Sequence, residues 1–291
     1  MNIIEFEHDT DKIYWGDALE VLASRIPDGS VDLIFADPPY NIGKKLANFI
    51  DKWPSEEAYA EWCTQWLELC MAKLTRTGSI YVMASTQSMP YLDLFLRKRM
   101  HILSRVVWHY DSSGVQARRI YGSMYEPILY CVKDRNCYTF NADEILVEAR
   151  TGAKRKLVDY RKAVPTEYSS TKVPGNVWSF PRVRYRMNEY EVHPAQKPEA
   201  LLERIIRASS NSGDMVMDPF SGTFTASAVA KKLGRRSIGI ELQEQYVKIG
   251  LRRLGIRSEL NGETLEPPKK NFSRRKSVKP TVVEQMGMFE K

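Results

Sequence analysis

The chain has 291 residues, of which 43% are hydrophobic, and its 43 basic and 36 acidic residues give a net charge of +7. This is enough for a sizeable core, as one large domain or as a domain with an elaboration. The four cysteines form no C-x-x-C pair and the four histidines are scattered, which argues against a disulfide framework, a zinc site or another metal cluster.

The N-terminus and the hydropathy favour a cytoplasmic protein without a membrane partner. The first residues, MNIIEFEHDT, carry acids instead of the basic cap and apolar run of a secretory signal. No apolar stretch approaches the roughly 18 residues that a membrane-spanning helix needs.

Short β-rich segments alternate with amphipathic helical patterns along the chain. The β-rich segments are 31–36, 78–84, 104–110, 127–133, 214–217 and 236–240. The helical patterns lie at 55–75, 201–206, 223–233 and 243–254. This alternation predicts an α/β fold, with a mostly parallel sheet covered by helices on both faces and ligands at the carboxyl ends of its strands.

Residues 111–192 interrupt the alternation. They are rich in Arg, Tyr, Ser and Pro, and we interpret them as an insertion that includes some core strand. The rest of the domain is then divided into 1–110 and 193–257. Residues 258–291 lose the apolar periodicity and are expected to form a flexible basic tail.

The positive charge is concentrated in two segments. Residues 150–186 hold ten Lys or Arg beside two acidic residues, and 267–291 hold seven beside two. The rest of the chain is therefore net acidic. Segregated positive charge favours a polyanionic partner, and we expect nucleic acid; the alternative is a solvated basic surface.

The loop Asp37-Pro38-Pro39-Tyr40 follows the apolar segment 31–36. The prolines fix the backbone and leave their carbonyls free as acceptors. Asp37 and the Pro38 carbonyl would each accept one N–H of a planar group bearing an NH₂, while Tyr40 stacks on its ring. Acceptors outside the ring plane free the lone pair of such an amine for attack, which stabilises the transition state. The alternative is a plain strand-ending turn.

A second loop, DPFSGTFT from Asp218 to Thr225, lies between a strand and a helical pattern. Small residues at such a turn let a ligand approach the backbone, and the helix N-terminus favours a carboxylate or phosphate. Glu241 lies about twenty residues further on, where nucleoside-binding folds place an acid for ribose hydroxyls. The loop lacks the full G-x-G-x-x-G pattern and does not identify a ligand by itself.

Together the two loops resemble those of amino-methylating DNA methyltransferases that use S-adenosylmethionine. The order, with DPPY first and a basic segment before DPFSGTFTAS, is similar to the β class of adenine-N6 and cytosine-N4 enzymes. The segments DSSGVQA, GSMYEPIL and KVPGNVW resemble solitary bacterial adenine-N6 methyltransferases. The resemblance covers roughly residues 13–254 and implies a Rossmann-like methyltransferase fold with circularly permuted motif order and a target-recognition insertion.

The resemblance also implies residue roles. Residues 1–110 become the catalytic half and 193–257 the cofactor-binding half. Asp37, Pro38, Pro39 and Tyr40 match the catalytic loop, and Asp37 favours adenine because the variant with Ser usually goes with cytosine. Other residues match positions that bind parts of the cofactor. Asp17 matches the position near its adenine, Glu241 the one at its ribose and Lys197 the one at its carboxylate. The loop residues match the positions at its methionine part: Asp218, Pro219, Phe220, Ser221, Gly222 and Thr223.

One position departs from the family pattern FxGxG, because Phe224 replaces the second glycine. Either the backbone needs no positive φ there, or Phe224 covers the cofactor, so we expect Gly222 to be the contact. The implied mechanism is direct attack of a flipped adenine's N6 on the sulfonium methyl. It needs no covalent intermediate, and no nucleophilic cysteine is apparent.

DNA contacts are expected in the insertion and after the catalytic loop. The candidates in the insertion are Ser112, Gln116, Arg118, Arg119, Arg182, Arg184 and Arg186. Arg182, Arg184 and Arg186 would lie on one face of an extended strand, where they contact either bases or only phosphates. Lys44 and Lys45 are expected near phosphates, in a segment that closes over the flipped base. Trp108 either flanks that base or packs in the core.

The C-terminal tail carries two further resemblances. PPKKNFSRRKSVKP is similar to a non-specific DNA tether. Gln285-Met286-Gly287-Met288-Phe289 resembles the peptide with which bacterial proteins dock on the replication sliding clamp, so Gln285, Met288 and Phe289 are candidate contacts. Related enzymes also form homodimers, which the residues themselves do not indicate.

Other functions remain open. Cytosine-N4 methylation uses the same loops. Enzymes that methylate RNA bases or protein glutamine also use an N/D-P-P-Y loop, but they usually place the cofactor loop first. A DNA-binding regulator on a decayed methyltransferase fold is the non-enzymatic alternative, and intact Asp37 and Tyr40 argue against it.

Overall fold

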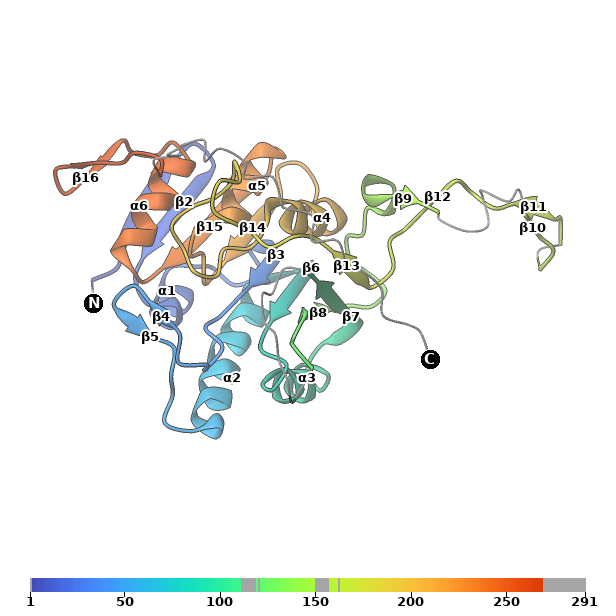
Figure 1. Ribbon diagram of the computed structural model, residues 1–291, viewed down its shortest axis with the longest axis horizontal. Coiled ribbons are helices and arrows are strands. Elements are labelled where there is room, and N and C mark those ends of the chain that lie inside the picture. Colours follow the sequence, from blue (N-terminus) through green and yellow to red (C-terminus); the bar gives the residue numbers. More distant parts are fainter. Residues whose placement is uncertain (1, 111–118, 120, 150–156, 162, 269–291) are drawn as a thin grey trace, which may run out of the picture.

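A nine-stranded sheet forms the centre of the protein (Figure 1). The structure, a computed structural model, describes residues 2–110, 119, 121–149, 157–161 and 163–268. The strand order in the sheet is β1-β2-β15-β14-β3-β6-β8-β7-β13. The strands are β1 Ile4–His8, β2 Asp11–Trp15, β3 Val31–Ala36, β6 Leu74–Met83, β7 His101–His109, β8 Tyr125–Val132, β13 Val177–Ser179, β14 Met215–Asp218 and β15 Arg236–Glu241.

The sheet is mixed but mostly parallel. Adjacent strands from β2 through β15, β14 and β3 to β6 are parallel, and β13 is parallel to β7. β1 is antiparallel to β2, and β8 is antiparallel to both β6 and β7. The predicted mostly parallel α/β fold is therefore confirmed.

Helices cover both faces of the sheet (Figure 1). Those described are α1 Ala18–Ser24, α2 Glu56–Lys73, α3 Met89–Leu96, α4 Glu199–Ser209, α5 Thr225–Lys232 and α6 Glu244–Arg253. Because side chains alternate along β3, Leu33 and Phe35 pack in the core cluster with α4 and α5. Ile34 and Ala36 pack in the other cluster, with α1, α2 and α3. A strand buried on both faces explains the unbroken apolar run.

The six β-rich segments and the four helical patterns of the α/β alternation are all present; β3 has the predicted ends, and the other strands and helices have shifted ends. The sequence analysis missed the hairpin β1–β2 and helices α1 and α3. In β1 apolar residues alternate with charged ones, and β2 has two charged residues followed by three apolar ones. Such short amphipathic strands carry a weaker signal than a fully buried strand.

Segment 111–192 contributes β8 and β13 to the main sheet, while its middle part lies outside it (Figure 1). That middle part contains η1 Ala142–Ile145, β9 Val147–Glu148, β10 Val158–Asp159, β11 Thr166–Glu167 and β12 Thr171–Lys172. β9 pairs with β12 and β10 with β11. Two further hairpins are β4–β5, Lys45–Leu46 with Phe49–Ile50, and β16–β17, Glu259–Leu260 with Glu263–Thr264.

No described helix is long and apolar enough to cross a membrane.

Candidate active site

The carboxyl ends of the parallel strands carry acids at one edge of the sheet. Asp37 follows β3, Asp218 ends β14, Glu241 ends β15, and Asp17 lies two residues after β2. A cavity of about 510 Å³ opens over this edge. It is lined by every predicted catalytic and cofactor-binding residue: Asp17, Asp37, Pro38, Pro39, Tyr40, Lys197, Asp218, Pro219, Phe220, Ser221, Gly222, Thr223 and Glu241. The structure thus brings together two loops that lie about 180 residues apart in the sequence.

Glu241 and the loop after β14 form one side of the cavity. Oε2 of Glu241 accepts a hydrogen bond from the Gly222 amide at 2.8 Å, and Oε1 accepts one from the Gln243 amide at 2.7 Å. Burial raises the pKa of Glu241 to about 7. Gly222 has φ +49°, and a Cβ there would lie 3.2 Å from Nε2 of His193. Glycine therefore suits this position, because it tolerates the positive φ and leaves room for His193.

The neighbouring acids are held by backbone amides. Asp218 is buried, accepts a hydrogen bond from the Phe220 amide at 2.9 Å, and has a pKa that burial raises well above its ordinary value. The ring of Phe220 packs edge-on against Trp66 of α2. Asp17 accepts hydrogen bonds from the amides of residues 19 and 20, and so caps the N-terminus of α1.

Phe224 contradicts both expectations about it. Its backbone does adopt a positive φ, +57°, and its side chain is fully buried instead of lying over the cavity. The ring packs between Gly239 of β15 and Gly250 of α6, where added Cβ atoms would approach it to about 2.5 and 2.4 Å. A non-glycine residue in this conformation is strained, and its tight packing offsets that strain.

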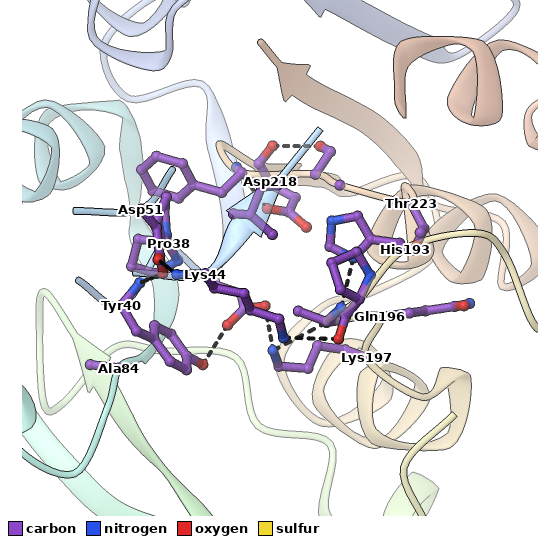
Figure 2. Close-up of a pocket in the computed structure, with 18 of the residues that line it drawn as sticks. Pro38, Tyr40, Lys44, Asp51, Ala84, His193, Gln196, Lys197, Asp218 and Thr223 are labelled. Atoms are coloured by element: carbon purple, nitrogen blue, oxygen red, sulfur yellow. Dashed lines mark hydrogen bonds and ion pairs between the residues drawn. The ribbon is translucent and has the colours of Figure 1, made fainter. Parts of the chain in front are cut away.

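Asp37 of the DPPY loop has two hydrogen-bond partners. Oδ1 accepts a hydrogen bond from the Tyr40 hydroxyl at 2.6 Å, and Oδ2 accepts one from Nζ of Lys197 at 2.6 Å. Figure 2 shows Tyr40 on one side of the pocket and His193 and Thr223 on the other, with the side chains of Lys44 and Lys197 reaching between them.

Lys197 therefore contacts Asp37, and its predicted contact with the cofactor carboxylate stays a prediction. Burial lowers its pKa, but the carboxylates of Asp37 and Glu126 outweigh burial, and the pKa lies above its ordinary value. Pro39 differs from expectation. Its carbonyl is not free, because it accepts a hydrogen bond from the Tyr59 hydroxyl of α2 at 2.7 Å.

The sequence analysis missed Glu126. Its Oε2 lies 3.0 Å from the Tyr40 hydroxyl and 3.5 Å from Nζ of Lys197. The Tyr110 hydroxyl lies 3.4 Å from its Oε1. The available signal was a single carboxylate within the apolar strand YEPILYCV, where burial of an acid needs a partner.

Comparison with known proteins identifies the family. A family model described as "DNA methylase" matches residues 31–252, which is most of the chain and includes both loops. The protein belongs to this DNA methylase family. The DNA adenine methyltransferase YhdJ of Escherichia coli (strain K12) is 56% identical over 274 residues, covering 93% of this chain and 92% of that protein. The type II methyltransferase M.HpaI of Haemophilus parainfluenzae is 36% identical, covering 81% of this chain and 71% of that protein.

Solved methyltransferase structures share the fold. The PvuII DNA methyltransferase (cytosine-N4-specific) superposes with a TM-score of 0.65 at 18% identity, covering 90% of this chain and 92% of that one. The M1.HpyAVI–SAM complex superposes with a TM-score of 0.55 at 24% identity, covering 84% and 99%.

Asp51 links the hairpin β4–β5 of this DNA methylase to the DPPY loop, and the sequence did not predict this role. Asp51 is buried and accepts hydrogen bonds from the amides of Lys44 and Tyr40. Nζ of Lys44 donates to the Pro194 carbonyl at 2.9 Å, so this side chain points into the cavity. Burial and the charge of Lys197 lower its pKa.

The predicted DNA contacts of the methylase differ in their exposure. Lys45, Arg119, Arg184 and Arg186 are exposed, whereas Ser112, Gln116 and Arg118 lie outside the described residues. The expected strand at 182–186 is wrong: the segment has no strand, and Arg186 has φ +80° in a turn. The three arginines therefore do not share one face of a strand. Arg182 lines the cavity, with its guanidinium 4.9 Å from the centre of the Tyr110 ring.

Trp108 belongs to the core of the methylase. It is 1% exposed, and its Nε1 donates to the Phe180 carbonyl at 2.9 Å. The cysteines in α2 are also core residues, as predicted. Burial raises the pKa of Cys63 to about 12, which leaves it uncharged and unreactive near neutral pH. Among the described residues no group of three His, Cys, Asp or Glu is arranged to hold a metal ion.

Proposed function

We propose that this protein transfers the methyl group of S-adenosylmethionine to the N6 amino group of an adenine flipped out of a specific double-stranded DNA sequence. The observation that carries the proposal is the shared cavity, in which Asp37 of the DPPY loop lies over the same sheet edge as Gly222 and Glu241. The choice of adenine is supported by Asp37 and by the 56% identity to a protein named a DNA adenine methyltransferase. The fold alone does not make that choice, because a cytosine-N4 enzyme shares it.

The residues on one side of the cavity fit S-adenosylmethionine. This cofactor carries a cationic sulfonium, an amino group and ribose hydroxyls, and the acids Asp17, Asp218 and Glu241 line the cavity where these groups need negative or accepting partners. The absence of a side chain at Gly222 leaves the loop backbone accessible. When bound, the cofactor supplies an electrophilic methyl group, and the protein binds and orients it.

The other side of the cavity fits the target amine. Asp37 and the Pro38 carbonyl are the proposed acceptors of the two N6–H groups. Tyr40 and Lys197 each donate one hydrogen bond to Asp37 in the free protein. A carboxylate has about four acceptor sites, so an incoming amine binds Asp37 while the Tyr40 hydroxyl stays in contact with it. The Tyr40 ring is the proposed stacking partner of the base, and Lys197 favours the ionised form of Asp37.

The substitution Asp37→Ala tests the role of this acid. We expect it to reduce methyl transfer to DNA at least about 100-fold, because it removes the acceptor that activates the amine. Cofactor affinity should change little, since Asp37 faces the amine. Radiolabelled methyl transfer to DNA, RNA and protein measures the first effect and calorimetry the second. Near wild-type transfer by the variant would contradict the role of Asp37, and label on RNA or protein alone would contradict the DNA substrate.

DNA recognition is proposed for the insertion 111–192, between the catalytic half 1–110 and the cofactor-binding half 193–257. Its exposed arginines and its ten basic residues within 150–186 support this assignment. Ser112, Gln116 and Arg118 remain candidate contacts by sequence alone. We further propose that the protein acts in the bacterial cytoplasm with the nucleoid, where its DNA substrate lies, and that it forms a homodimer, as related enzymes do.

The basic tail 258–291 is proposed to tether DNA and to bind the replication sliding clamp through Gln285, Met288 and Phe289. Purified clamp should retain the wild-type protein and lose the double variant Gln285→Ala/Phe289→Ala. Glu290→Ala, next to the motif, is the matched control and should be retained like wild type. Equal retention of the double variant would end the clamp proposal without affecting the proposed catalysis.

A further inference from the structure

Tyr40 lies between two carboxylates. Its hydroxyl oxygen is 2.6 Å from Oδ1 of Asp37 and 3.0 Å from Oε2 of Glu126. A phenol has one hydrogen to donate, and an ionised carboxylate has none. If both acids are ionised, one of these short contacts therefore joins two acceptors without a hydrogen between them. Both contacts become hydrogen bonds only when the group binds one additional proton.

Burial also disfavours two negative charges here. The side chains of Asp37 and Glu126 are 15% and 16% exposed, and Lys197, at 8%, supplies one positive charge between them. Burial raises the pKa of Asp37, and the charge of Glu126 raises it further, while Lys197 opposes both. A pair of carboxylates with one compensating cation takes up a proton more readily than a single paired carboxylate.

Three other groups face the cluster. The Tyr110 hydroxyl, just after β7, contacts Oε1 of Glu126 at 3.4 Å. Lys44, before β4, and Arg182 line the same cavity. Arg182 lies over the Tyr110 ring, with its guanidinium 4.9 Å from the centre of the ring. Burial and the charges of Lys197 and Arg182 lower the pKa of Lys44.

We propose that Glu126 and Asp37 share one proton through the Tyr40 hydroxyl, and that Glu126 stores the proton which the substrate amine loses during methylation. This inference rests on the proposed adenine methylation. Glu126 acts through Tyr40 and is a positioning residue for Asp37. Bound S-adenosylmethionine brings a positive charge to the cavity, so the shared proton leaves when the cofactor binds and the acids are ready to receive another.

The transfer step then balances. The bond from N6 to the methyl carbon forms while the carbon–sulfur bond breaks, and the electron pair of that bond stays on sulfur. N6, now positively charged, gives one proton to Asp37. Asp37 passes a proton to the Tyr40 oxygen as Tyr40 passes its own to Glu126. The positive charge lost from sulfur is matched by the negative charge lost from the acids, so no charge builds up in the buried site.

Proton release on cofactor binding tests the inference without any methyl transfer. Calorimetric titration with S-adenosylmethionine near neutral pH, in buffers of different ionisation enthalpy, counts the protons released per cofactor. Glu126→Gln keeps the shape of the side chain, and its amide can donate to Tyr40 without an added proton. Wild type should release more protons per cofactor than Glu126→Gln. Glu241, with its pKa of about 7, also releases protons on binding, but equally in both proteins.

A second variant tests the same inference if Glu126→Gln folds poorly. Tyr40→Phe keeps both acids and removes the bridging hydroxyl, and it should also release fewer protons than wild type. Equal release from wild type and either folded variant would overturn the shared proton. If the protein methylates adenine but wild type and the variants release equal numbers of protons, this inference alone is refuted. If the proton release differs as expected but DNA is not methylated, the proposed function is refuted.

Discussion

At the scale of single residues, short motifs at strand ends were predictable and their distant partners were not. Asp37 and Glu241 follow strands that the apolar pattern identifies, so their placement at one sheet edge follows from the order of the loops. Glu126 lies 86 residues from Tyr40 in the sequence, and Lys197 lies 160 residues from Asp37. No local pattern relates residues so far apart, and their contact depends on strand order.

Phe224 shows how a residue can break a motif without disturbing the site. The family pattern has glycine at this position, and the backbone of Phe224 adopts a positive φ, against the expectation drawn from its side chain. The compensation comes from Gly239 and Gly250, whose missing side chains leave room for the ring. Because these glycines lie on β15 and α6, the sequence of the loop alone could not reveal the compensation.

This packing predicts the effect of Gly250→Ala. The new Cβ would lie 2.4 Å from the buried Phe224 ring, so we expect a loss of about 1–3 kcal/mol in the free energy of unfolding, measured with denaturant. The loss should occur although alanine is favoured over glycine within a helix by up to about 1 kcal/mol.

Two controls separate the clash from other effects of the substitution. Gly175→Ala adds a Cβ that meets nothing within 4 Å and should change stability by less than about 0.5 kcal/mol. In a Phe224→Ala background, Gly250→Ala should become neutral or stabilising, because the ring is gone. If Gly250→Ala costs no more than Gly175→Ala, the packing of Phe224 is not what constrains this position.

At the scale of elements, strands buried on both faces were the most predictable. β3 carries apolar side chains on each face, and its limits were predicted to the residue. The prediction of a strand at 182–186 was wrong. It rested on the alternating arginines, but the segment forms no strand in the structure. Alternation of charged residues predicts a strand only where another strand is available to bond to it.

The irregular segment after β13 gives its arginines separate roles. Arg182 reaches the cavity beside Tyr110, whereas Arg184 and Arg186 are exposed. The exposed pair is the better candidate for phosphate contacts, because a phosphate contact needs an accessible guanidinium.

Salt dependence of DNA binding measures those contacts. Each phosphate contact contributes about 0.9 to the slope of the logarithm of affinity against the logarithm of salt concentration. We expect Arg184→Ala/Arg186→Ala to lower that slope by about 1–2, with DNA binding followed by anisotropy. Arg25→Ala is the control, because Arg25 caps the end of α1 remote from the cavity edge and should leave the slope unchanged. An unchanged slope in the double variant would exclude both arginines from the phosphate contacts.

At the scale of the whole molecule, the distribution of charge agrees with the arrangement of the fold. Acids gather inside the cavity at the strand ends, and basic residues are concentrated in the insertion and the tail. This separation suits an enzyme that binds a cationic cofactor within the sheet edge and a polyanion around it. The family and the general fold followed from motif order, whereas the hydrogen-bonded acid cluster required the three-dimensional structure.

The identity of the methylated base tests the proposed function most directly. Double-stranded DNA is incubated with the protein and S-adenosylmethionine labelled in its methyl group, digested to nucleosides, and analysed by mass spectrometry. The proposed function predicts label in N6-methyladenine with wild type and its loss with Asp37→Ala. Label in N4-methylcytosine instead, or N6-methyladenine formed equally by both proteins, would contradict it.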